Sequence, residues 1–411
     1  MELKDGYKKT GVGVIPEDWD VKQLGDIANV IGGGTPSSFN NSYWNGDINW
    51  YTPTEIGKEK YSYESVRKIT KLGFENCSAK ILPKGTILLT TRAGIGDVSI
   101  LMNEACTNQG FQSFVCKDNF NNEFLYYLIS TLKNVFLQYA SGSTFLEISP
   151  NKIKAILVPF PRTKAEQTLI ATALSDADAL ICNLEKLIEK KRAIKQGAMQ
   201  QLLKPKEGWV VNKLGDLTKV FTKQTGFDYT AYIKPSLVQN KTDDTIPFIQ
   251  NKDFNNRWIN LNTDYFIPKS IAIQFPKILL NEKSLLISIS GSVGNVGLYD
   301  SKELAFIGGA VAILKFKESD LIDWVMFYLK SNEGQKKLLD NVKAGSHQNL
   351  ILDDIRKIEI PFPKKEEQTR IATVLSDMDV EINTLVTKLE KQKMIKQGMM
   401  QNLLTGKIRL I

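Results

Sequence analysis

Two long stretches of the chain place apolar residues at spacings that alternate between four and three. Glutamate, lysine, aspartate and glutamine fill many of the positions between them. This heptad pattern is typical of an amphipathic helix that packs along another helix. The apolar seam positions are Ile170, Leu174, Ala177, Ile181, Leu184 and Ile188 in the first stretch, and Ile371, Leu375, Met378, Ile382, Leu385 and Leu389 in the second.

Proline stands before both stretches and is absent within them, which marks where each helix begins. We predict a central helix over residues 162–204 and a C-terminal helix over residues 364–411. About 40 helical residues at 1.5 Å each would give a rod of roughly 60 Å. A helix of this length with one apolar seam needs a partner, and each helix is the obvious partner of the other.

The two predicted helices are also copies of one sequence. Residues 167–203 and 368–404 are identical at 21 of 37 aligned positions, and Pro-Phe-Pro precedes each copy. A weaker echo relates residues 19–27 to residues 209–217. Duplication with a period near half of the 411-residue chain indicates two copies of one structural unit. A twofold axis across two equivalent helices reverses one of them, so we predict an antiparallel coiled coil.

The regions that precede the helices, residues 1–161 and 205–363, have a different pattern. Short β-branched and aromatic runs alternate with turn residues, which is typical of strands. The predicted strands are 86–91, 111–115, 285–290 and 309–314, and the predicted helices are 123–138 and 320–340. The sequence therefore predicts an α+β fold in which two similar globular domains form a pseudo-twofold internal repeat.

Composition narrows the class of protein only slightly. Lysine and arginine exceed aspartate and glutamate by 53 to 45, which permits contact with nucleic-acid phosphates without requiring it. No apolar run approaches the length of a membrane span, and the first residues lack a signal-peptide pattern, so we expect a cytoplasmic protein. The four cysteines lack the spacing of zinc ligands, and we expect them to be reduced.

Several motifs resemble those of the specificity subunit of type I restriction-modification systems. Gly32-Gly33-Gly34-Thr35-Pro36 is similar to a Gly-Gly-Thr-Pro turn of that family. Val-Pro-Phe-Pro at residues 158–161, the Ile-Ala…Leu-Ser-Asp-x-Asp opening of each helix and the closing residues 401–410 are similar as well. The second half has Thr-Lys-Gln-Thr-Gly at residues 222–226 where the first has the glycine turn, so we expect the two domains to recognise unlike half-sites.

The resemblance implies an architecture and a set of partners. Residues 1–161 and 205–363 would be two target recognition domains, each followed by a matched helix. The chain would bind double-stranded DNA and two methyltransferase subunits, and would reach restriction motor-nuclease subunits through the complex. S-adenosylmethionine, ATP and Mg²⁺ would bind those partner subunits, and no cofactor would bind this chain.

The sequence agrees with a non-catalytic subunit, because it contains no recognisable catalytic motif. The Asn/Asp-Pro-Pro-aromatic loop that an adenine methyltransferase needs is missing from the sequence. The glycine-rich residues 291–297 lack the GxGxxG spacing and a P-loop lysine, and residues 92–97 repeat their glycines, so we predict a hairpin. His347 is the single histidine, which makes a loop residue near DNA or water a better interpretation than a metal ligand.

DNA-binding residues can be proposed only by position. Bases are recognised by Arg, Lys, Asn, Gln, Ser and Thr on projecting elements, and glycine-rich turns hold phosphates. An ordinary solvated loop residue is an equally good interpretation of any one candidate. The candidates are Thr35, Arg92, Ser141, Ser143 and Thr144 in the first domain, and Lys223, Gln224, Ser292, Asn295, His347, Gln348 and Asn349 in the second.

These observations favour a DNA specificity subunit without catalytic activity of its own. Each domain would recognise a few base pairs in the major groove, and the coiled coil would set the gap between the two half-sites. An independent DNA-binding regulator, a scaffold that contacts only proteins, and a cryptic nuclease remain alternatives.

Overall fold

The computed structural model describes residues 5–92, 94–142, 146–340 and 349–410. Four predicted DNA-binding residues, Ser143, Thr144, His347 and Gln348, lie outside these ranges. The chain divides into two compact units. The first comprises Met1–Leu184 and Lys388–Ile411, and the second comprises Glu185–Thr387. Each unit therefore contains one globular domain and a part of each long helix.

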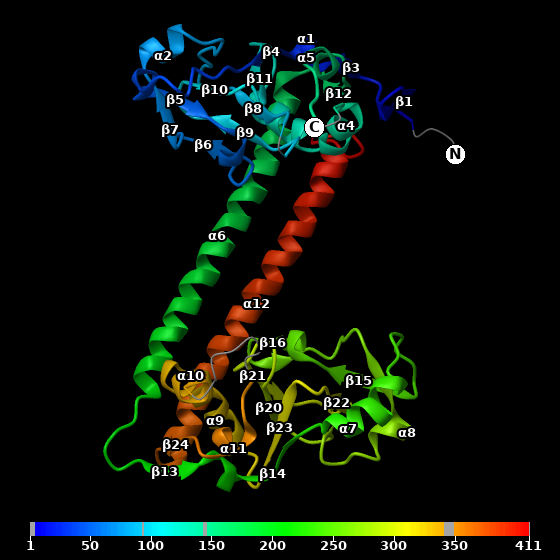
Figure 1. The fold of residues 1–411 in the computed structure, drawn as a ribbon. Coiled ribbons are helices and arrows are strands. Elements are labelled where there is room, and N and C mark those ends of the chain that lie inside the picture. The colour runs from blue at the N-terminus through cyan, green and yellow to red at the C-terminus, as the bar shows by residue number, and fades with distance from the viewer. Residues whose placement is uncertain (1–4, 93, 143–145, 341–348, 411) are drawn as a thin grey trace. The chain divides into compact units, whose positions relative to one another are not determined.

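The two long helices, α6 (Lys164–Leu202) and α12 (Lys365–Leu403), have 39 residues each. Figure 1 draws each as one continuous helix. Their length at 1.5 Å per residue is about 58 Å. Both begin a few residues after a proline and carry glutamate in the first turn, where the positive end of the helix dipole stabilises an anion.

The helices pair in opposite directions in both units. In the first unit, Asp178 of α6 forms an ion pair with Lys396 of α12. In the second unit, Lys195 of α6 lies 2.5 Å from Asp379 of α12, and Lys191 lies 2.6 Å from Glu381. Residue numbers rise along one helix as they fall along the other, so the pairing is antiparallel. The predicted fold, two similar α+β domains joined by two long helices, is confirmed.

The seam residues divide between two environments. Those at the start of each helix belong to the hydrophobic core of a globular domain, and those farther along are buried or half-buried on the helices. The core members are Ile170, Leu174, Ile371 and Leu375; the buried later members are Leu184, Ile188, Ile382 and Leu389; the half-buried ones are Ile181 and Leu385.

The globular domain of the first unit is built on a five-stranded sheet of order β4-β11-β8-β9-β6 and a three-stranded sheet of order β10-β5-β7 (Figure 1). Helix α3 lies against β9, where the sheet and helix bury a shared core. The elements are β1 (Tyr7–Thr10), β2 (Gly13–Pro16), β3 (Trp19–Gln23), α1 (Leu24–Ile27), β4 (Ala28–Gly32), β5 (Trp44–Tyr51), β6 (Tyr61–Ser62), β7 (Arg67–Ile69), α2 (Lys71–Glu75), β8 (Ile87–Thr90), β9 (Val98–Leu101), β10 (Ala105–Thr107), β11 (Phe111–Cys116), α3 (Asn122–Ser130), α4 (Lys133–Tyr139), α5 (Pro150–Lys154) and β12 (Leu157–Pro161).

The second unit repeats this topology with two additional short strands. Its sheets have the orders β14-β23-β20-β21-β17-β16 and β18-β15-β22-β19, and α9 lies against β20 and β21. The elements are β13 (Val210–Lys213), β14 (Thr218–Lys223), α7 (Gly226–Asp228), β15 (Thr245–Ile249), β16 (Phe254–Asn255), β17 (Trp258–Ile259), β18 (Phe266–Pro268), α8 (Lys269–Ala272), β19 (Leu279–Leu280), β20 (Ser284–Ser288), β21 (Val296–Tyr299), β22 (Ala305–Ile307), β23 (Val311–Phe316), α9 (Leu321–Lys330), α10 (Asn332–Leu339), α11 (Leu352–Arg356) and β24 (Glu359–Phe362).

Each helical run predicted within a domain is divided into two helices. In the second unit the break falls at Ser331, whose hydroxyl accepts a hydrogen bond from the Gly334 amide and caps the start of α10. Gly334 is required there because a Cβ would lie 2.0 Å from the Tyr328 carbonyl oxygen. Continuous apolar periodicity hides such a break, because the cap depends on one serine and one close backbone approach.

An aspartate anchors the helix pair at each domain, with different partners. In the first unit, Asp178 accepts a 2.6 Å hydrogen bond from the Tyr127 hydroxyl in addition to its ion pair with Lys396. In the second unit, Phe327 occupies the repeat position of that tyrosine and has no hydroxyl to donate. One oxygen of Asp379 is consequently buried without a hydrogen-bond partner.

The end of the chain completes the first unit. Leu403 and Leu404 join its hydrophobic core, and the Arg409 guanidinium contacts both Glu166 and Asp18, the latter through two hydrogen bonds of 2.8 Å. Glu166 is buried and also accepts a hydrogen bond from the Trp19 indole nitrogen. Hydrogen bonding from Arg409 holds the pKa of Asp18 below its ordinary value.

We predict that Arg409→Ala destabilises the first unit by about 3 kcal/mol, because it leaves the buried carboxylate of Glu166 without its cation. Urea unfolding at pH 7 measures this loss. Because the pKa of Asp18 is lowered in the folded state, its ionised carboxylate stabilises the fold at pH values above the ordinary pKa of 3.8. This contribution to the unfolding free energy is lost as the pH falls through the lowered pKa.

Lys206→Ala provides the matched control. Lys206 pairs with Glu367, the repeat counterpart of Glu166, but its side chain is 57% exposed. An exposed pair contributes about 0–1 kcal/mol. Equal losses in the two variants would contradict the assignment of Arg409 as the cation of a buried carboxylate.

Candidate nucleic-acid interface

In the first unit, four turns gather at one end of the large sheet. The described residues of these turns, 33–36, 91–92, 94–97, 108–110, 141–142 and 146–149, are called the turn cluster below. Hydrogen bonds join them: the Gly34 amide donates to the Thr107 carbonyl at 2.8 Å, and the Thr91 amide donates to the Gly110 carbonyl at 2.8 Å. The equivalent residues of the second unit are 223–226, 289–295, 308–310 and 349–352. Strand order therefore places loops that are distant in sequence side by side.

A buried hydroxyl group holds the hairpin tip in each turn cluster. The Thr90 hydroxyl donates to the Gly94 carbonyl at 2.6 Å and accepts from the Asp97 amide at 3.0 Å. In the second unit the Ser288 hydroxyl donates to the Ser292 carbonyl at 2.6 Å and accepts from the Asn295 amide at 2.8 Å. The hairpin expected from the glycine-rich residues 291–297 is thus present between β20 and β21.

The first turn of each cluster, residues 33–36 in the first unit and 223–226 in the second, differs in sequence and makes different contacts. A Cβ on Gly33 would lie 2.3 Å from the Thr107 carbonyl oxygen and 2.0 Å from the Asn108 carbonyl oxygen, so only glycine fits there. In the second unit Gln224 instead donates its side-chain amide to the Ile307 carbonyl. Gln224 is 4% exposed, so in this conformation its side-chain amide is engaged with the backbone and is not presented at the surface.

The described candidates of the first domain all lie in its turn cluster. Thr35 is exposed and donates a hydrogen bond to Gln109. Arg92 lies 2.7 Å from the Glu147 carboxylate. Ser141 is exposed and forms a β-bridge with Glu147. The fold therefore brings these candidates together from three different loops.

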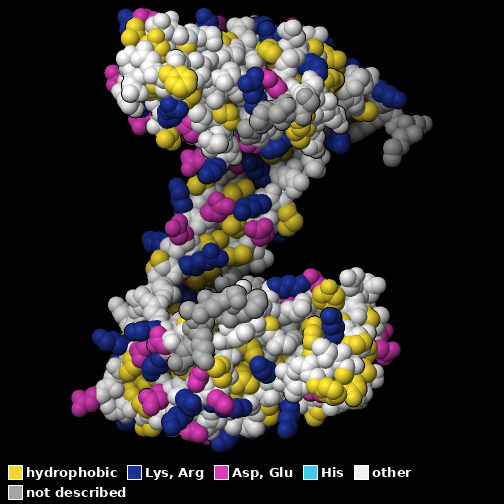
Figure 2. All heavy atoms as spheres, viewed as in Figure 1, with side chains coloured by type: hydrophobic (Ala, Val, Ile, Leu, Met, Phe, Trp, Pro, Cys, Tyr) yellow, Lys and Arg dark blue, Asp and Glu magenta, His cyan; other side chains and the backbone are white. Residues whose placement is uncertain are grey.

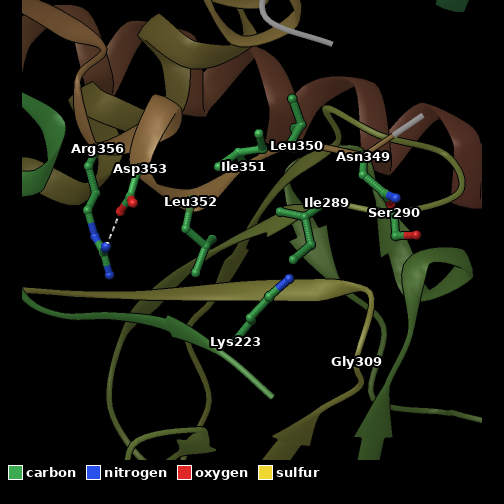
Figure 3. A pocket seen from close by; sticks show the side chains of 10 residues that line it. All are labelled: Lys223, Ile289, Ser290, Gly309, Asn349, Leu350, Ile351, Leu352, Asp353 and Arg356. Atoms are coloured by element: carbon green, nitrogen blue, oxygen red, sulfur yellow. Dashed lines mark hydrogen bonds and ion pairs between the residues drawn. The ribbon is translucent and has the colours of Figure 1, made fainter. Parts of the chain in front are cut away.

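In the second domain, Lys223 and Asn349 line a pocket of about 560 Å³, together with Ser290 and Arg356. Figure 3 shows Arg356 paired with Asp353 at one end of this pocket and Asn349 beside Ser290 at the other. Ile289, Leu350, Ile351 and Leu352 supply the apolar lining.

Ser292 and Asn295, the other two described candidates of the second domain, are exposed residues of the hairpin tip. The Asn295 side chain donates to the Ser292 carbonyl at 3.3 Å, which adds to the hydrogen bonds from Ser288. Both side chains are therefore presented by a turn whose backbone is fixed.

Glu147 belongs to the turn cluster, although the sequence did not single it out. Cationic and neutral polar side chains are the usual contacts with DNA, whereas an acidic side chain is repelled by phosphates. The internal repeat could have indicated Glu147, because Asn349, a predicted DNA-binding residue, occupies the equivalent position in the second domain.

Charge does not mark one face as the binding surface. In Figure 2, Lys and Arg side chains are interspersed with Asp and Glu over the face shown. Among the described residues, no group of His, Cys, Asp and Glu side chains could hold a metal ion. The described helices also include none that is long and apolar enough to cross a membrane. The four cysteines are free thiols, and burial raises the pKa of Cys106 to about 12.

We predict that Thr90→Val lowers the unfolding free energy of the first unit by about 2 kcal/mol, because a buried amide and a carbonyl lose their shared partner. Urea unfolding measures the loss, and hydrogen exchange at the Asp97 amide should accelerate. Thr10→Val is the control: it removes a solvent-exposed hydrogen bond to the Gly13 carbonyl and a long one, 3.3 Å, from the Val12 amide, and it should cost less than about 0.5 kcal/mol. Unchanged protection of Asp97 would contradict the proposed role of Thr90.

Two sequence comparisons bear on the family. The type I restriction modification DNA specificity domain matches residues 16–196 and again residues 206–395. The MjaIX specificity subunit of a type I restriction enzyme from Methanocaldococcus jannaschii is 30% identical to this chain, over 98% of this chain and 96% of its own length. A putative MjaX specificity subunit from the same organism is 29% identical, over 99% and 97%.

Solved structures share the fold. The S subunit of a type I restriction-modification system from M. genitalium has a TM-score of 0.59 and 16% identity, with 98% of each chain covered. A chain from a study of complex assembly and conformational transition in the type I system has a TM-score of 0.60 and 16% identity, covering 96% of this chain and 99% of its own. The duplicated domain match and the end-to-end likeness agree, and the chain belongs to the family of type I restriction-modification specificity subunits, with two DNA specificity domains.

Proposed function

We propose that this chain is the non-catalytic, DNA-recognising subunit of a methyltransferase and endonuclease complex, and that it binds a bipartite target. The observation that carries the proposal is the duplicated specificity domain, which matches residues 16–196 and 206–395. Two domains with one topology and different turns suit two short, unlike half-sites. Each turn cluster would contact one half-site in the major groove.

Specific side chains within the turn clusters would make these contacts. Exposed hydroxyl, amide and cationic groups are the ones that recognise base edges or hold phosphates. In the first domain they are Thr35, Arg92 and Ser141, and in the second Lys223, Ser292, Asn295 and Asn349. The predicted residues Ser143, Thr144, His347 and Gln348 stay candidates on the basis of sequence position alone.

The long helices would set the gap between the half-sites and receive the partners. Their length of about 58 Å exceeds one turn of DNA, about 34 Å. Helix α6 exposes Leu169 and Leu180 in the first unit and Ile194 in the second. Because the family resemblance implies two methyltransferase partners, we assign the exposed faces of the helices to these two subunits, through which motor-nuclease subunits would join.

The reactions would take place on the partners. S-adenosylmethionine would bind the methyltransferase subunits, and ATP and Mg²⁺ the motor-nuclease subunits. The complex would act in the cytoplasm, where genomic DNA is the substrate. This chain would contribute sequence selection and geometry.

Mapping of methylated adenines in the host genome, with and without the gene for this chain, tests the proposal. We expect one bipartite methylated sequence, with two unlike half-sites and a fixed gap, to disappear with the gene. A methylation pattern that does not depend on the gene would contradict the proposal. Mg²⁺-dependent cleavage of DNA by the purified chain alone would also contradict it.

We predict that removal of one heptad from both helices shortens the gap by about three base pairs, because seven helical residues span roughly 10 Å. The deletion takes residues 187–193 from α6 and residues 381–387, which face them in the antiparallel register, from α12. Methylome sequencing of the variant measures the gap. Alanine at the exposed residues Glu189 and Lys190, without deletion, should leave the gap unchanged. A shortened variant that still selects the original gap would contradict the proposal that these helices set the spacing.

A further inference from the structure

The two turn clusters differ at one pair of equivalent positions. Arg92 stands two residues after Thr90, and Ser290 stands two residues after Ser288, whose hydroxyl holds the hairpin tip in the same way. Across the cluster, Glu147 precedes the buried Ile148 as Asn349 precedes the buried Leu350. The first domain therefore has an Arg–Glu pair where the second has Ser and Asn.

Stability does not explain this ion pair. The Arg92 and Glu147 side chains are 41% and 38% exposed, with 2.7 Å between the guanidinium nitrogen and the carboxylate oxygen. Ion pairs with this exposure contribute little to folding. An exposed carboxylate also repels a DNA backbone, so a glutamate in a DNA-binding turn needs another reason. Its visible effect is to fix the direction of an otherwise flexible guanidinium.

A fixed guanidinium at a projecting turn suits one base. Arginine has five N–H donors, and its contact with Glu147 through one terminal nitrogen leaves donors for a second acceptor. Two parallel N–H donors match the O6 and N7 acceptors of guanine in the major groove. Lysine cannot reproduce this geometry because its ammonium group acts as a point charge.

We propose that Arg92 recognises a guanine in the half-site bound by the first domain, and that Glu147 is the positioning residue that orients it. The proposal rests on the proposed function and deepens it. Ser290 and Asn349 cannot supply a carboxylate-oriented guanidinium, so the corresponding position of the other half-site follows a different rule. Asparagine is the side chain that makes a comparable bidentate contact with adenine, accepting from N6 and donating to N7.

The test uses the full-length chain assembled with its methyltransferase subunits. Duplexes carry the target defined by the host methylome, with each of the four base pairs placed in turn at every half-site position, and the methylation rate is measured for each. The variants are Arg92→Lys, Glu147→Ala and Glu147→Gln. Arg162→Lys is the matched control, because Arg162 forms an exposed pair with Asp20 at 2.8 Å on β3, outside the turn cluster.

We expect Arg92→Lys to reduce the preference for a G·C pair at one position by about tenfold, within the range of a bidentate arginine contact. Glu147→Ala should reduce the same preference about threefold to tenfold, while binding to a non-target duplex stays equal or strengthens, because a negative charge is lost. Glu147→Gln should recover part of the preference, because its amide oxygen can still accept from the guanidinium. The other half-site and the Arg162→Lys profile should not change.

Several results would overturn the assignment. The assignment is wrong if Arg92→Lys changes the preference for a G·C pair at no position of either half-site. This holds even if the bipartite methylation mark depends on this chain. Equal losses at both half-sites would give the pair a structural role instead. A lower affinity of the variants for the methyltransferase subunit, with an unchanged base profile, would place the pair at a protein interface. Loss of the methylation mark itself is a separate outcome that belongs to the proposed function.

Discussion

Antiparallel pairing of two equivalent helices is the constraint on which each unit depends. Each globular core includes residues from the end of the long helix that arrives from the other unit. The first unit takes Leu403 and Leu404 from the end of the chain, and the second takes Met199 from the last turn of α6 and Leu203 directly after that helix. Because the apolar seam continues from the domain core along the helix, the same residues that stabilise the domain also fix where each helix leaves it. Folding of each unit therefore requires the helix pairing to form.

The repeat preserves packing more strictly than it preserves polar contacts. Both units use an aspartate to anchor the helix pair, yet only Asp178 has a tyrosine hydroxyl beside it. Burial and the neighbouring carboxylate raise the pKa of Tyr127 above its ordinary value, so the hydroxyl remains a donor at neutral pH. Asp379 retains a buried oxygen without a partner, which costs free energy that the first unit avoids. Duplicated units can diverge in this way because the apolar core carries most of the stability.

Sequence patterns were sufficient to locate both long helices and two strands of each large sheet, because heptads and strand alternation are local signals. The C-terminal helix predicted over residues 364–411 ends earlier, at Leu403. The range predicted for the central helix, residues 162–204, contains the observed α6, Lys164–Leu202. The division at Ser331 depends on a local serine cap and a close backbone approach, which continuous apolar periodicity hides. The burial of Gln224 was not predictable because it depends on a contact with distant backbone. Residue type alone made Gln224 look like a DNA-binding side chain. Its actual partner, the Ile307 carbonyl, is 83 residues away in the sequence.

The turn clusters separate the groups that hold the loops from the groups that differ between the domains. Thr90 and Ser288 are both buried and form equivalent hydrogen bonds, so the hairpin backbone is supported from within. Arg92 and Ser290 project from that backbone and differ in size, charge and partner. An exposed side chain on a supported turn can change at little cost in stability, whereas a change in the buried hydroxyl cannot. A duplicated domain built this way can acquire a second specificity without rebuilding its scaffold.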